Sequence, residues 1–274
     1  MVDGSNLLFQ MFFGMPSRII NKDGKAIHGT LGFVGALLKI IKMVNPTHVA
    51  VLFDGDCSQE RIDTNADYKA NRVDYSCVAE EENPFSQLND IYNALDYLKI
   101  CHTESCGCET DDIIASYALS LGNQMKITIS SFDSDFFQLI NENVNILRYR
   151  GDNTVICDQR FLFQKFAISP CQYADFKSLT GDNADNVKGA DKVGPKTASA
   201  LINQFGSLEN LLNNAESITK PSVKQSVIAC KQRLLDNYKI IKLQNNCPLP
   251  FTLNQLQYTL PQTSTKQVLT AINL

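Results

Sequence analysis

Several features that would place a chain in a specialised class are missing from this sequence. No apolar run approaches the roughly 18 residues that a membrane span needs. The first residues contain no basic segment followed by an apolar one, so no secretory signal is expected. There is also no internal repeat and no low-complexity tract. We therefore expect a cytoplasmic globular protein that does not associate with membranes, and we take it to be a monomer.

A complete zinc site is missing as well. The nine cysteines are irregularly spaced, which suits free thiols in a reducing cytosol. Cys101, Cys106 and Cys108 lie close together, but no second Cys/His pair completes a set of four ligands. We interpret these residues as buried or surface thiols.

The chain has no overall excess of basic residues. Its net charge of −4 argues at first against a nucleic-acid partner. The charge is segregated, however, because acidic residues gather in the first two thirds and a basic stripe follows. Eight basic residues stand against four acidic ones between Lys188 and Lys239, namely Lys188, Lys192, Lys196, Lys220, Lys224, Lys231, Arg233 and Lys239. Global charge is therefore a poor guide to the partners of this chain.

Nine carboxylates fall where predicted strands end and predicted helices begin. They are Asp3, Asp54, Glu109, Asp111, Asp112, Asp133, Asp135, Asp182 and Asp185. Two unit charges ~4 Å apart repel by ~4 kcal/mol at an effective dielectric of 20, so a shared site must be neutralised. Mg²⁺ accepts carboxylate oxygens, and two ions ~3.5–4 Å apart clamp the attacking and leaving oxygens of a phosphodiester. The pattern indicates a metal-dependent nuclease.

Strand and helix patterns alternate along the first half of the chain. Strands are expected at the start of residues 2–15 and over 47–53, 125–131, 144–150 and 154–156; helices are expected in the rest of 2–15 and over 32–44, 85–98 and 111–121. Residues 59–83 are polar and read as a mobile connection or an exposed helical excursion. The alternation predicts an α/β fold with a doubly wound parallel sheet, whose ligands lie beyond the carboxyl ends of the strands. From Pro170 onward the pattern is of short helices and turns.

The spacing of the acidic pairs predicts shared faces. Asp133 and Asp135 are two apart at a strand end, so both should point the same way. Asp182 and Asp185 are three apart, which places them on one helical face, as it does Glu109 and Asp112. Each acid alone could instead be a turn former, a helix cap or a partner of a helix dipole.

Seven short motifs occur in a specific order along the chain. They are Met1-Val2-Asp3-Gly4-Ser5-Asn6, Phe53-Asp54-Gly55, Tyr68-Lys69-Ala70-Asn71-Arg72, Glu109-Thr110-Asp111-Asp112, Phe132-Asp133-Ser134-Asp135, Gly181-Asp182-Asn183-Ala184-Asp185-Asn186 and Gly189-Ala190-Asp191-Lys192-Val193-Gly194-Pro195-Lys196-Thr197-Ala198. Over residues 1 to about 240 the series resembles the 5′-nuclease family, which includes the 5′→3′ exonuclease domain of bacterial DNA polymerase I, phage 5′-exonucleases and flap endonucleases.

The resemblance implies a PIN-like parallel-sheet nuclease core over residues 1–170, with an arch segment at about 59–83. A helical DNA-binding region over 171–274 would follow, with a helix–three-turn–helix element at about 185–240. Two Mg²⁺ ions, for which Mn²⁺ can substitute, are implied. Asp3, Asp54, Glu109, Asp111 and Asp112 would build the first metal site, and Asp133, Asp135, Asp182 and Asp185 the second.

The resemblance also implies roles for residues outside the acidic set. In the arch, Lys69 would contact the scissile phosphate, Arg72 would act as a phosphate fork, and Tyr68 would stack on a base. In the hairpin, Gly189, Val193, Gly194, Lys196 and Thr197 would hold DNA, and a K⁺ ion is implied at the same loop. The chain departs from the family at Phe9-Gln10, where many relatives carry an arginine, so one phosphate contact is expected to be missing or supplied from elsewhere.

We therefore expect a stand-alone, structure-specific 5′→3′ exonuclease and flap endonuclease that acts on DNA with 5′ flaps, nicks or free 5′ ends. The expectation of a stand-alone enzyme rests on the absence of a polymerase domain within the 274 residues. Two alternatives stay open at this stage. One is a PIN-type ribonuclease, and the other is a non-catalytic DNA-binding scaffold with the same fold.

Overall fold

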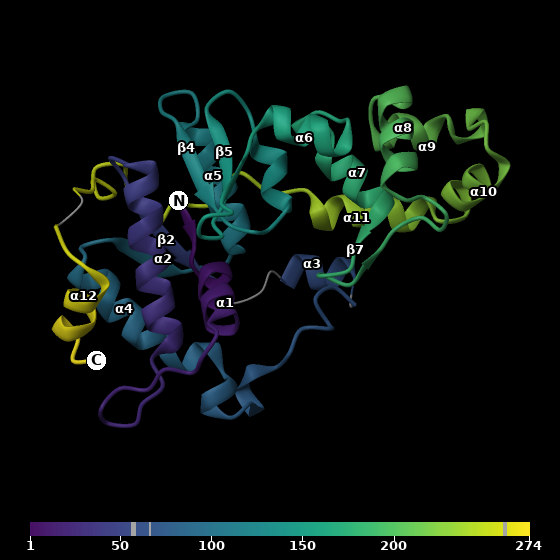
Figure 1. Cartoon of the computed structure of the whole chain (residues 1–274). Coiled ribbons are helices and arrows are strands. Elements are labelled where there is room, and N and C mark those ends of the chain that lie inside the picture. The colour runs from purple at the N-terminus through teal and green to yellow at the C-terminus, as the bar shows by residue number, and fades with distance from the viewer. Residues whose placement is uncertain (56–58, 66, 260–261) are drawn as a thin grey trace.

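The computed structural model describes residues 1–55, 59–65, 67–259 and 262–274 (Figure 1). Its strands are β1 (Val2–Asp3), β2 (Ala50–Phe53), β3 (Cys101–Glu104), β4 (Ile127–Ser130), β5 (Val144–Arg148), β6 (Val155–Cys157), β7 (Gly181–Asp182) and β8 (Val187–Lys188). Its helices are α1 (Gly4–Gly14), α2 (His28–Val44), α3 (Gln59–Thr64), α4 (Leu88–Tyr97), α5 (Thr110–Leu121), α6 (Gln159–Phe166), α7 (Tyr173–Thr180), α8 (Pro195–Phe205), α9 (Leu208–Asn213), α10 (Pro221–Ala229), α11 (Lys231–Ile241) and α12 (Thr265–Ala271).

The main sheet has the strand order β3-β2-β1-β4-β5-β6. Neighbouring strands from β3 to β5 run parallel, and β6 pairs antiparallel with β5 as the second arm of a hairpin. From β1 at the centre, β2 and β3 extend the sheet on one side, and β4, β5 and β6 extend it on the other, which is the doubly wound arrangement. The expected α/β fold is confirmed, with an antiparallel strand at one edge.

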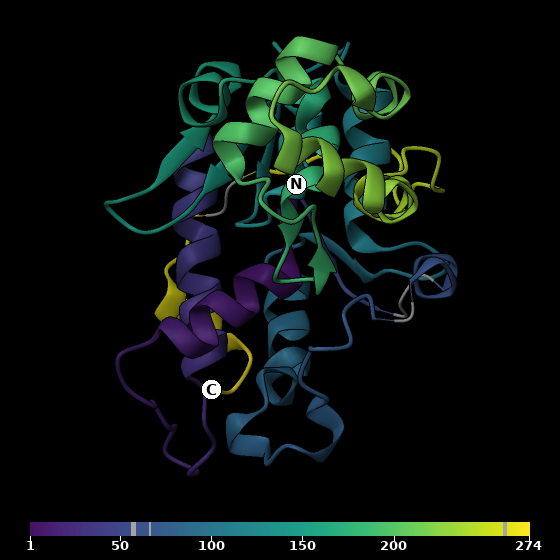
Figure 2. The ribbon, with the colours of Figure 1, turned by 90° about the vertical axis from the view of Figure 1, so that its right-hand side faces the viewer.

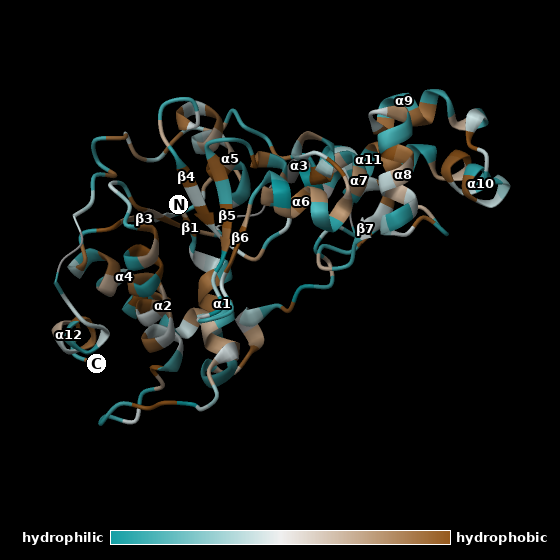
Figure 3. Ribbon diagram, turned by 45° about the horizontal axis from the view of Figure 1, so that its top comes forward, coloured by the Kyte–Doolittle hydropathy of each residue, from teal (hydrophilic) through white to brown (hydrophobic). Residues whose placement is uncertain are grey.

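Alternate residues of β2 show how the two faces of the sheet are covered. Ala50 and Leu52 belong to the hydrophobic core that contains α5 and the helices of the second half of the chain. Val51 and Phe53 belong to a second core, which α1, α2 and α4 close on the other face. This period of two is what a strand buried on both faces requires. Figure 3 shows hydrophobic residues gathered along the strands and hydrophilic ones on the connections.

The elements from α7 to α11 are mainly helical and stand to one side of the sheet (Figures 1 and 2). Helix α7 packs on α11 and α8, and β7 and β8 form a separate antiparallel ribbon. Helix α12 returns to pack on α2 and α4. Within the described residues, no helix is both long and apolar enough to span a membrane.

Several elements differ from the sequence-based expectations. Strand β3 was not predicted, because Cys-His-Thr-Glu at a half-exposed sheet edge carries no apolar run. Helix α6 was not predicted either. The expected helix over 85–98 begins as a 3₁₀ turn at Pro84–Gln87 and becomes α4 only from Leu88. Within residues 59–83 the structure has α3 and two 3₁₀ turns, which agrees with a helical excursion.

Candidate active site

Four of the predicted acids meet at the carboxyl edge of the sheet. Asp3 ends β1, Asp54 follows β2, Asp133 follows β4, and Asp111 lies in the first turn of α5. Strands β2, β1 and β4 are neighbours, so their ends lie side by side. None of these four carboxylates forms an ion pair within the part of the chain that the structure describes. We call Asp3, Asp54, Asp111 and Asp133 the uncompensated group.

Hydrogen bonds hold the uncompensated group in place. Asp3 caps α1, since its Oδ1 accepts from the Asn6 N–H at 3.0 Å, and its Oδ2 accepts from Ser131 Oγ at 2.7 Å. Ser131 Oγ also accepts from the N–H of Asp133 at 3.0 Å. One hydroxyl therefore ties the end of β1 to the loop after β4.

Burial and mutual repulsion act on the acids of this group. Burial, followed by the negative charges of Asp54 and Asp133, raises the pKa of Asp3 to about 7. Burial and then Asp133, Asp3 and Asp54 also raise the pKa of Asp111 well above its usual range. These shifts mark a concentration of negative charge that a divalent cation would relieve.

Two further acids, Glu109 and Asp112 at the start of α5, form ion pairs with cations of residues 59–83. Arg61 of α3 is buried and donates from Nη1 to Glu109 Oε2 and from Nη2 to Asp112 Oδ1, the latter at 2.7 Å. Lys69 Nζ reaches the same Glu109 oxygen at 3.0 Å. Burial alone would raise the pKa of Glu109, but Lys69 and Arg61 outweigh it and hold that pKa below its usual value. Glu109 Oε1 is buried and has no hydrogen-bond partner among the described residues.

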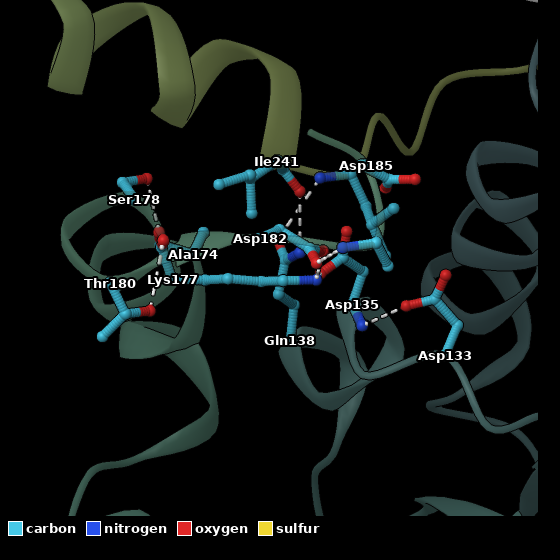
Figure 4. Close-up of polar contacts among 12 residues, drawn as sticks. Asp133, Asp135, Gln138, Ala174, Lys177, Ser178, Thr180, Asp182, Asp185 and Ile241 are labelled. Carbon is cyan, nitrogen blue, oxygen red and sulfur yellow. Dashed lines mark hydrogen bonds and ion pairs between the residues drawn. The ribbon is translucent and has the colours of Figure 1, made fainter. Parts of the chain in front are cut away.

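The third set of acids lies between the sheet and the helical region (Figure 4). Carboxylate oxygens of Asp135, Asp182 and Asp185 all lie within 4.8 Å of one another, a spacing at which one metal ion can bind all three. We call these three residues the paired cluster, because each one carries a cationic partner. Lys177 of α7 pairs with Asp135 and with Asp182, the latter at 2.5 Å, and Arg72 Nη2 lies 3.0 Å from Asp185 Oδ1.

Burial and neighbouring charges shift the pKa values of Asp135 and of its partner Lys177. Burial raises the pKa of Asp135 to about 7, although Lys177 opposes the shift. Burial would lower the pKa of Lys177, but Asp135, Asp133 and Asp182 raise it instead, so Lys177 stays protonated. Asp133 acts on both acidic sets and joins them electrostatically.

The geometry of two acidic pairs differs from the prediction. Asp182 and Asp185 do not share a helical face, because Asp182 lies in β7 and Asp185 in the turn that leads to β8. Asp135 begins a 3₁₀ turn rather than continuing a strand, and its N–H donates to Asp133 Oδ1 at 2.8 Å. Both pairs still reach the acidic edge, but tight turns bring them there.

Tyr68 and Lys69 of the arch segment point into the acidic edge, whereas Arg72 is half-exposed at its rim. The Lys69 N–H donates to the Asp185 carbonyl at 3.1 Å, and Asn71 Nδ2 donates to the Asn183 carbonyl at 3.2 Å. Tyr68 is only 8% exposed and its hydroxyl donates to Glu109 Oε2 at 3.3 Å, so in this conformation its ring is not presented to a base. The segment is thus fastened to the β7–β8 turn.

The hairpin before α8 divides into a packed half and an open half. A Cβ on Gly189 would lie 2.4 Å from the Leu179 carbonyl oxygen, and Val193 is buried, so these two residues serve internal packing. A Cβ on Gly194 would meet no atom of the described residues within 4 Å, and Lys196 is exposed with Thr197 half-buried beside it at the start of α8. The backbone of the open half can therefore approach a ligand.

Two residues add to the set predicted from sequence. Arg61 and Lys177 neutralise predicted ligands and were missed. Arg61 lies in a polar stretch, and α7 contains Asp175, Ser178 and Thr180 beside Lys177, so neither cation stands out in the sequence. Gln10, where an arginine was expected from the resemblance, donates from Nε2 to the Tyr149 carbonyl at 2.6 Å. It therefore binds the backbone just after β5.

The residues present fit divalent cations. The uncompensated group supplies oxygen ligands that form no ion pair with any described residue, and Glu109 Oε1, which has no hydrogen-bond partner among those residues, is a further buried acceptor. The paired cluster supplies three converging carboxylates. An all-oxygen ligand set is the type that Mg²⁺ and Mn²⁺ prefer.

Comparison with known proteins identifies the family. Residues 1–167 match the 5′-3′ exonuclease, N-terminal resolvase-like domain, and residues 168–264 match the 5′-3′ exonuclease, C-terminal SAM fold. The chain belongs to the 5′-3′ exonuclease family. The expected resemblance and the expected enzyme class, a metal-dependent 5′-nuclease, are thereby confirmed.

Individual relatives agree with this membership. The chain is 31% identical over 262 residues to a 5′-3′ exonuclease of Aquifex aeolicus, and the match covers 95% of this chain and 86% of that protein. It is 32% identical over 264 residues to DNA polymerase I of Rhizobium leguminosarum, with 93% of this chain covered. The chain spans only about a quarter of the length of that polymerase.

A solved structure shares the fold. The bacteriophage T5 flap endonuclease, determined as a pseudo-enzyme-product complex with DNA and metal ions, superimposes with a TM-score of 0.73. The two chains are 22% identical, and the match covers 100% of this chain and 98% of the other. The likeness extends over the sheet and the helical region together.

Proposed function

We propose that this chain is a structure-specific 5′→3′ exonuclease and flap endonuclease that hydrolyses DNA with two divalent metal ions. The observation that carries the proposal is the meeting of Asp3, Asp54, Asp111 and Asp133 at one edge of the sheet, with the three converging carboxylates of the paired cluster next to them. The Aquifex aeolicus relative, most of which the chain covers, supports action without an attached polymerase. The T5 complex with DNA and metal ions supports a DNA substrate.

In this proposal the acids divide between two ions. The uncompensated group and Glu109 would hold one ion, with Asp112 acting through Arg61 and solvent. The paired cluster would hold the other, with Asp133 between the two. When bound, the ions would supply Lewis-acid stabilisation of the charge that develops on the reacting phosphodiester.

The chain's own cations would act on the substrate. Lys69 and Arg72 lie at the rim of the acidic edge, where a phosphate could replace the carboxylates that they now bind. A phosphate held by both would be oriented against the metal-binding acids, and the ammonium of Lys69 would stabilise its developing charge. Glu109 and Asp112 are buried, so water is excluded from their ion pairs with Lys69 and Arg61, and the lower dielectric strengthens those pairs.

The helical elements from α7 to α11 would hold the duplex. Gly194 offers an open backbone, and Lys196 and Thr197 begin a helix whose N-terminus favours phosphate. Lys192, Lys196, Lys220 and Lys231 form no ion pair within the described residues, so their charge is available to a nucleic-acid backbone. A K⁺ ion at the hairpin belongs to the same proposal; DNA affinity in KCl should exceed that in choline chloride at equal ionic strength.

One experiment separates the proposed function from its alternatives. Radiolabelled 5′ flap, nicked duplex and single strand, each as DNA and as RNA, would be incubated with Mg²⁺, with Mn²⁺ and with EDTA. We expect metal-dependent cleavage of the DNA flap and nick that leaves a 5′-phosphate. Preference for the RNA substrates would favour a PIN-type ribonuclease, and DNA binding without any cleavage would favour a scaffold.

A further inference from the structure

A protein cation already lies in the paired cluster. The side chain of Lys177 is only 7% exposed, and its Nζ reaches both Asp135 and Asp182 (Figure 4). The two acids come from different parts of the chain, the turn after β4 and the β7–β8 ribbon. Lys177 therefore connects the sheet to the helical region through charge.

The position of Lys177 is fixed by its surroundings. It lies in the second half of α7, which packs on α11 and on the 3₁₀ turn that begins at Asp135. Its neighbour Ser178 is fully buried and donates to the Ala174 carbonyl, and Asn237 of α11 donates to the Ser178 carbonyl. If the Lys177 side chain left this position for solvent, buried Asp135 and partly buried Asp182 would lose their shared partner, which is costly.

The other cation of the cluster is held loosely. Arg72, which pairs with Asp185, is half-exposed. A substrate phosphate could therefore draw Arg72 away, but it could not draw Lys177 from its site. By contrast, the uncompensated group carries no ion pair at all among the described residues.

We propose that Lys177 is a resident counter-cation of Asp135 and Asp182, which holds these two acids together without metal and lowers the affinity of the paired cluster for a divalent ion. The uncompensated group then fills first, and the paired cluster fills at higher metal concentration. The inference rests on the proposed function only in treating the acids as metal ligands. Its physical basis is that a divalent ion must displace the ammonium or lie beside it, and like charges at such distances repel strongly.

Metal binding to the DNA-free protein tests this directly. Free Mn²⁺ would be titrated by electron paramagnetic resonance in wild type and in Lys177→Met, which keeps the length of the side chain and removes its charge. Lys266→Met removes the same charge from α12, on the far side of the molecule (Figure 1), and serves as the control. We expect the weaker Mn²⁺ site to tighten at least tenfold in Lys177→Met and to be unchanged in the control.

Two further variants assign the effect to the cluster. Adding Asp182→Asn to Lys177→Met should abolish the gain, since one of the freed carboxylates is gone. Lys177→Gln, whose amide can still donate to Asp135, should tighten the weaker site by a smaller factor. An unchanged or weakened site in folded Lys177→Met would overturn the proposal, as would an equal gain in the Lys266→Met control.

Folding supplies an independent readout. Without its ammonium, the variant should melt at a lower temperature than wild type in EDTA, and Mn²⁺ should raise its melting temperature more than that of wild type. A variant that folds only with Mn²⁺ supports the proposal, because the ion then takes the place of the ammonium. A variant that folds in neither condition overturns it. None of these measurements uses cleavage, so a failed nuclease assay and a failed counter-cation remain distinguishable.

Discussion

Lys69 Nζ and Glu109 Oε2 form an ion pair of 3.0 Å that joins the arch segment to the start of α5. The same carboxylate oxygen also accepts from Arg61 and Tyr68, while its partner oxygen Oε1 accepts from nothing in the described residues. Lys69 is therefore held next to the acids in the absence of substrate. Exchange of this carboxylate for a phosphate would deliver the ammonium to the reacting group.

Replacing Lys69 by alanine should slow cleavage far more than it weakens binding. A donor aimed at developing charge is typically worth ~10²–10³ in rate. Single-turnover cleavage of a 5′ flap and its dissociation constant measured in Ca²⁺ would separate the two effects, with Lys266→Ala as the control. A change in the dissociation constant alone would make Lys69 a positioning contact.

Neutralising Asp111 should stabilise the metal-free protein while it abolishes cleavage. Asp111 forms no hydrogen bond or ion pair that the described part of the chain records, and its three acidic neighbours repel it. Asp111→Asn removes that repulsion and also removes a metal ligand worth several kcal/mol of charge stabilisation, hence ~10³-fold or more in rate. Thermal melting in EDTA and single-turnover cleavage in Mg²⁺ would be compared with Asp152→Asn, an exposed residue of the β5–β6 turn. If Asp111→Asn melted at a lower temperature than wild type in EDTA, charge repulsion at Asp111 would not destabilise the metal-free protein, and the prediction would be wrong.

The acidic edge was largely predictable from the sequence because local rules determine it. Asp54 and Asp133 directly follow apolar strands, and parallel strands end at one edge. The cations were not predictable in the same way. Arg61 lies in a polar stretch, and only contacts with residues about fifty positions away show that it is buried. The same holds for Lys177, whose partner Asp135 is 42 positions away.

Two further differences have local causes. Strand β3 escaped prediction because its pairing with β2, rather than its composition, makes it a strand. The spacing of Asp182 and Asp185 suggested a helix, but Gly181, at a φ of 79°, ends α7 immediately before them. Glycine adopts that conformation without the penalty a side chain would add, and the chain turns into the ribbon instead.

Replacing Lys196 by alanine should weaken DNA binding and reduce its dependence on salt. Each lost phosphate contact removes ~0.9 from the slope of log affinity against log salt on duplex DNA. Binding of a nicked duplex would be measured in Ca²⁺ from low to moderate salt. Lys165→Ala, on the exposed surface of α6, is the matched control and should leave the slope unchanged. An equal slope in Lys196→Ala and wild type would reduce the hairpin to a turn without a role in binding.

Mg²⁺ should stabilise the protein more at pH 8 than at pH 5.5. In the metal-free folded state the pKa values of Asp3 and Asp135 are about 7, whereas in the unfolded chain these groups ionise near their ordinary value of 3.8. Between these values the folded state binds more protons than the unfolded state, so the contribution of these groups to the free energy of unfolding falls as pH rises from about 4 to about 7. At pH 8 the carboxylates repel, and a metal ion removes that repulsion; at pH 5.5 protons have already done so. Melting temperatures with and without Mg²⁺ at both pH values would test this, and a larger shift at pH 5.5 would contradict it.

Two glycines of the hairpin motif should respond oppositely to alanine. In Gly189→Ala the new Cβ would lie 2.4 Å from the Leu179 carbonyl oxygen and 2.6 Å from the Gly181 N, both backbone atoms that cannot turn aside. Overpacking of this kind typically costs ~1–3 kcal/mol, and here it would also shift the β7–β8 ribbon that carries Asp182. Gly194→Ala adds a methyl group to open space and should leave the melting temperature unchanged. Its effect should appear in DNA affinity, because a side chain would hold a phosphate away from the start of α8. Thermal melting and nicked-duplex binding would be measured for both variants. If Gly194→Ala binds like wild type, the backbone at this residue does not touch DNA. If Gly189→Ala melts like wild type, the close approach of α7 and the hairpin is not required for stability.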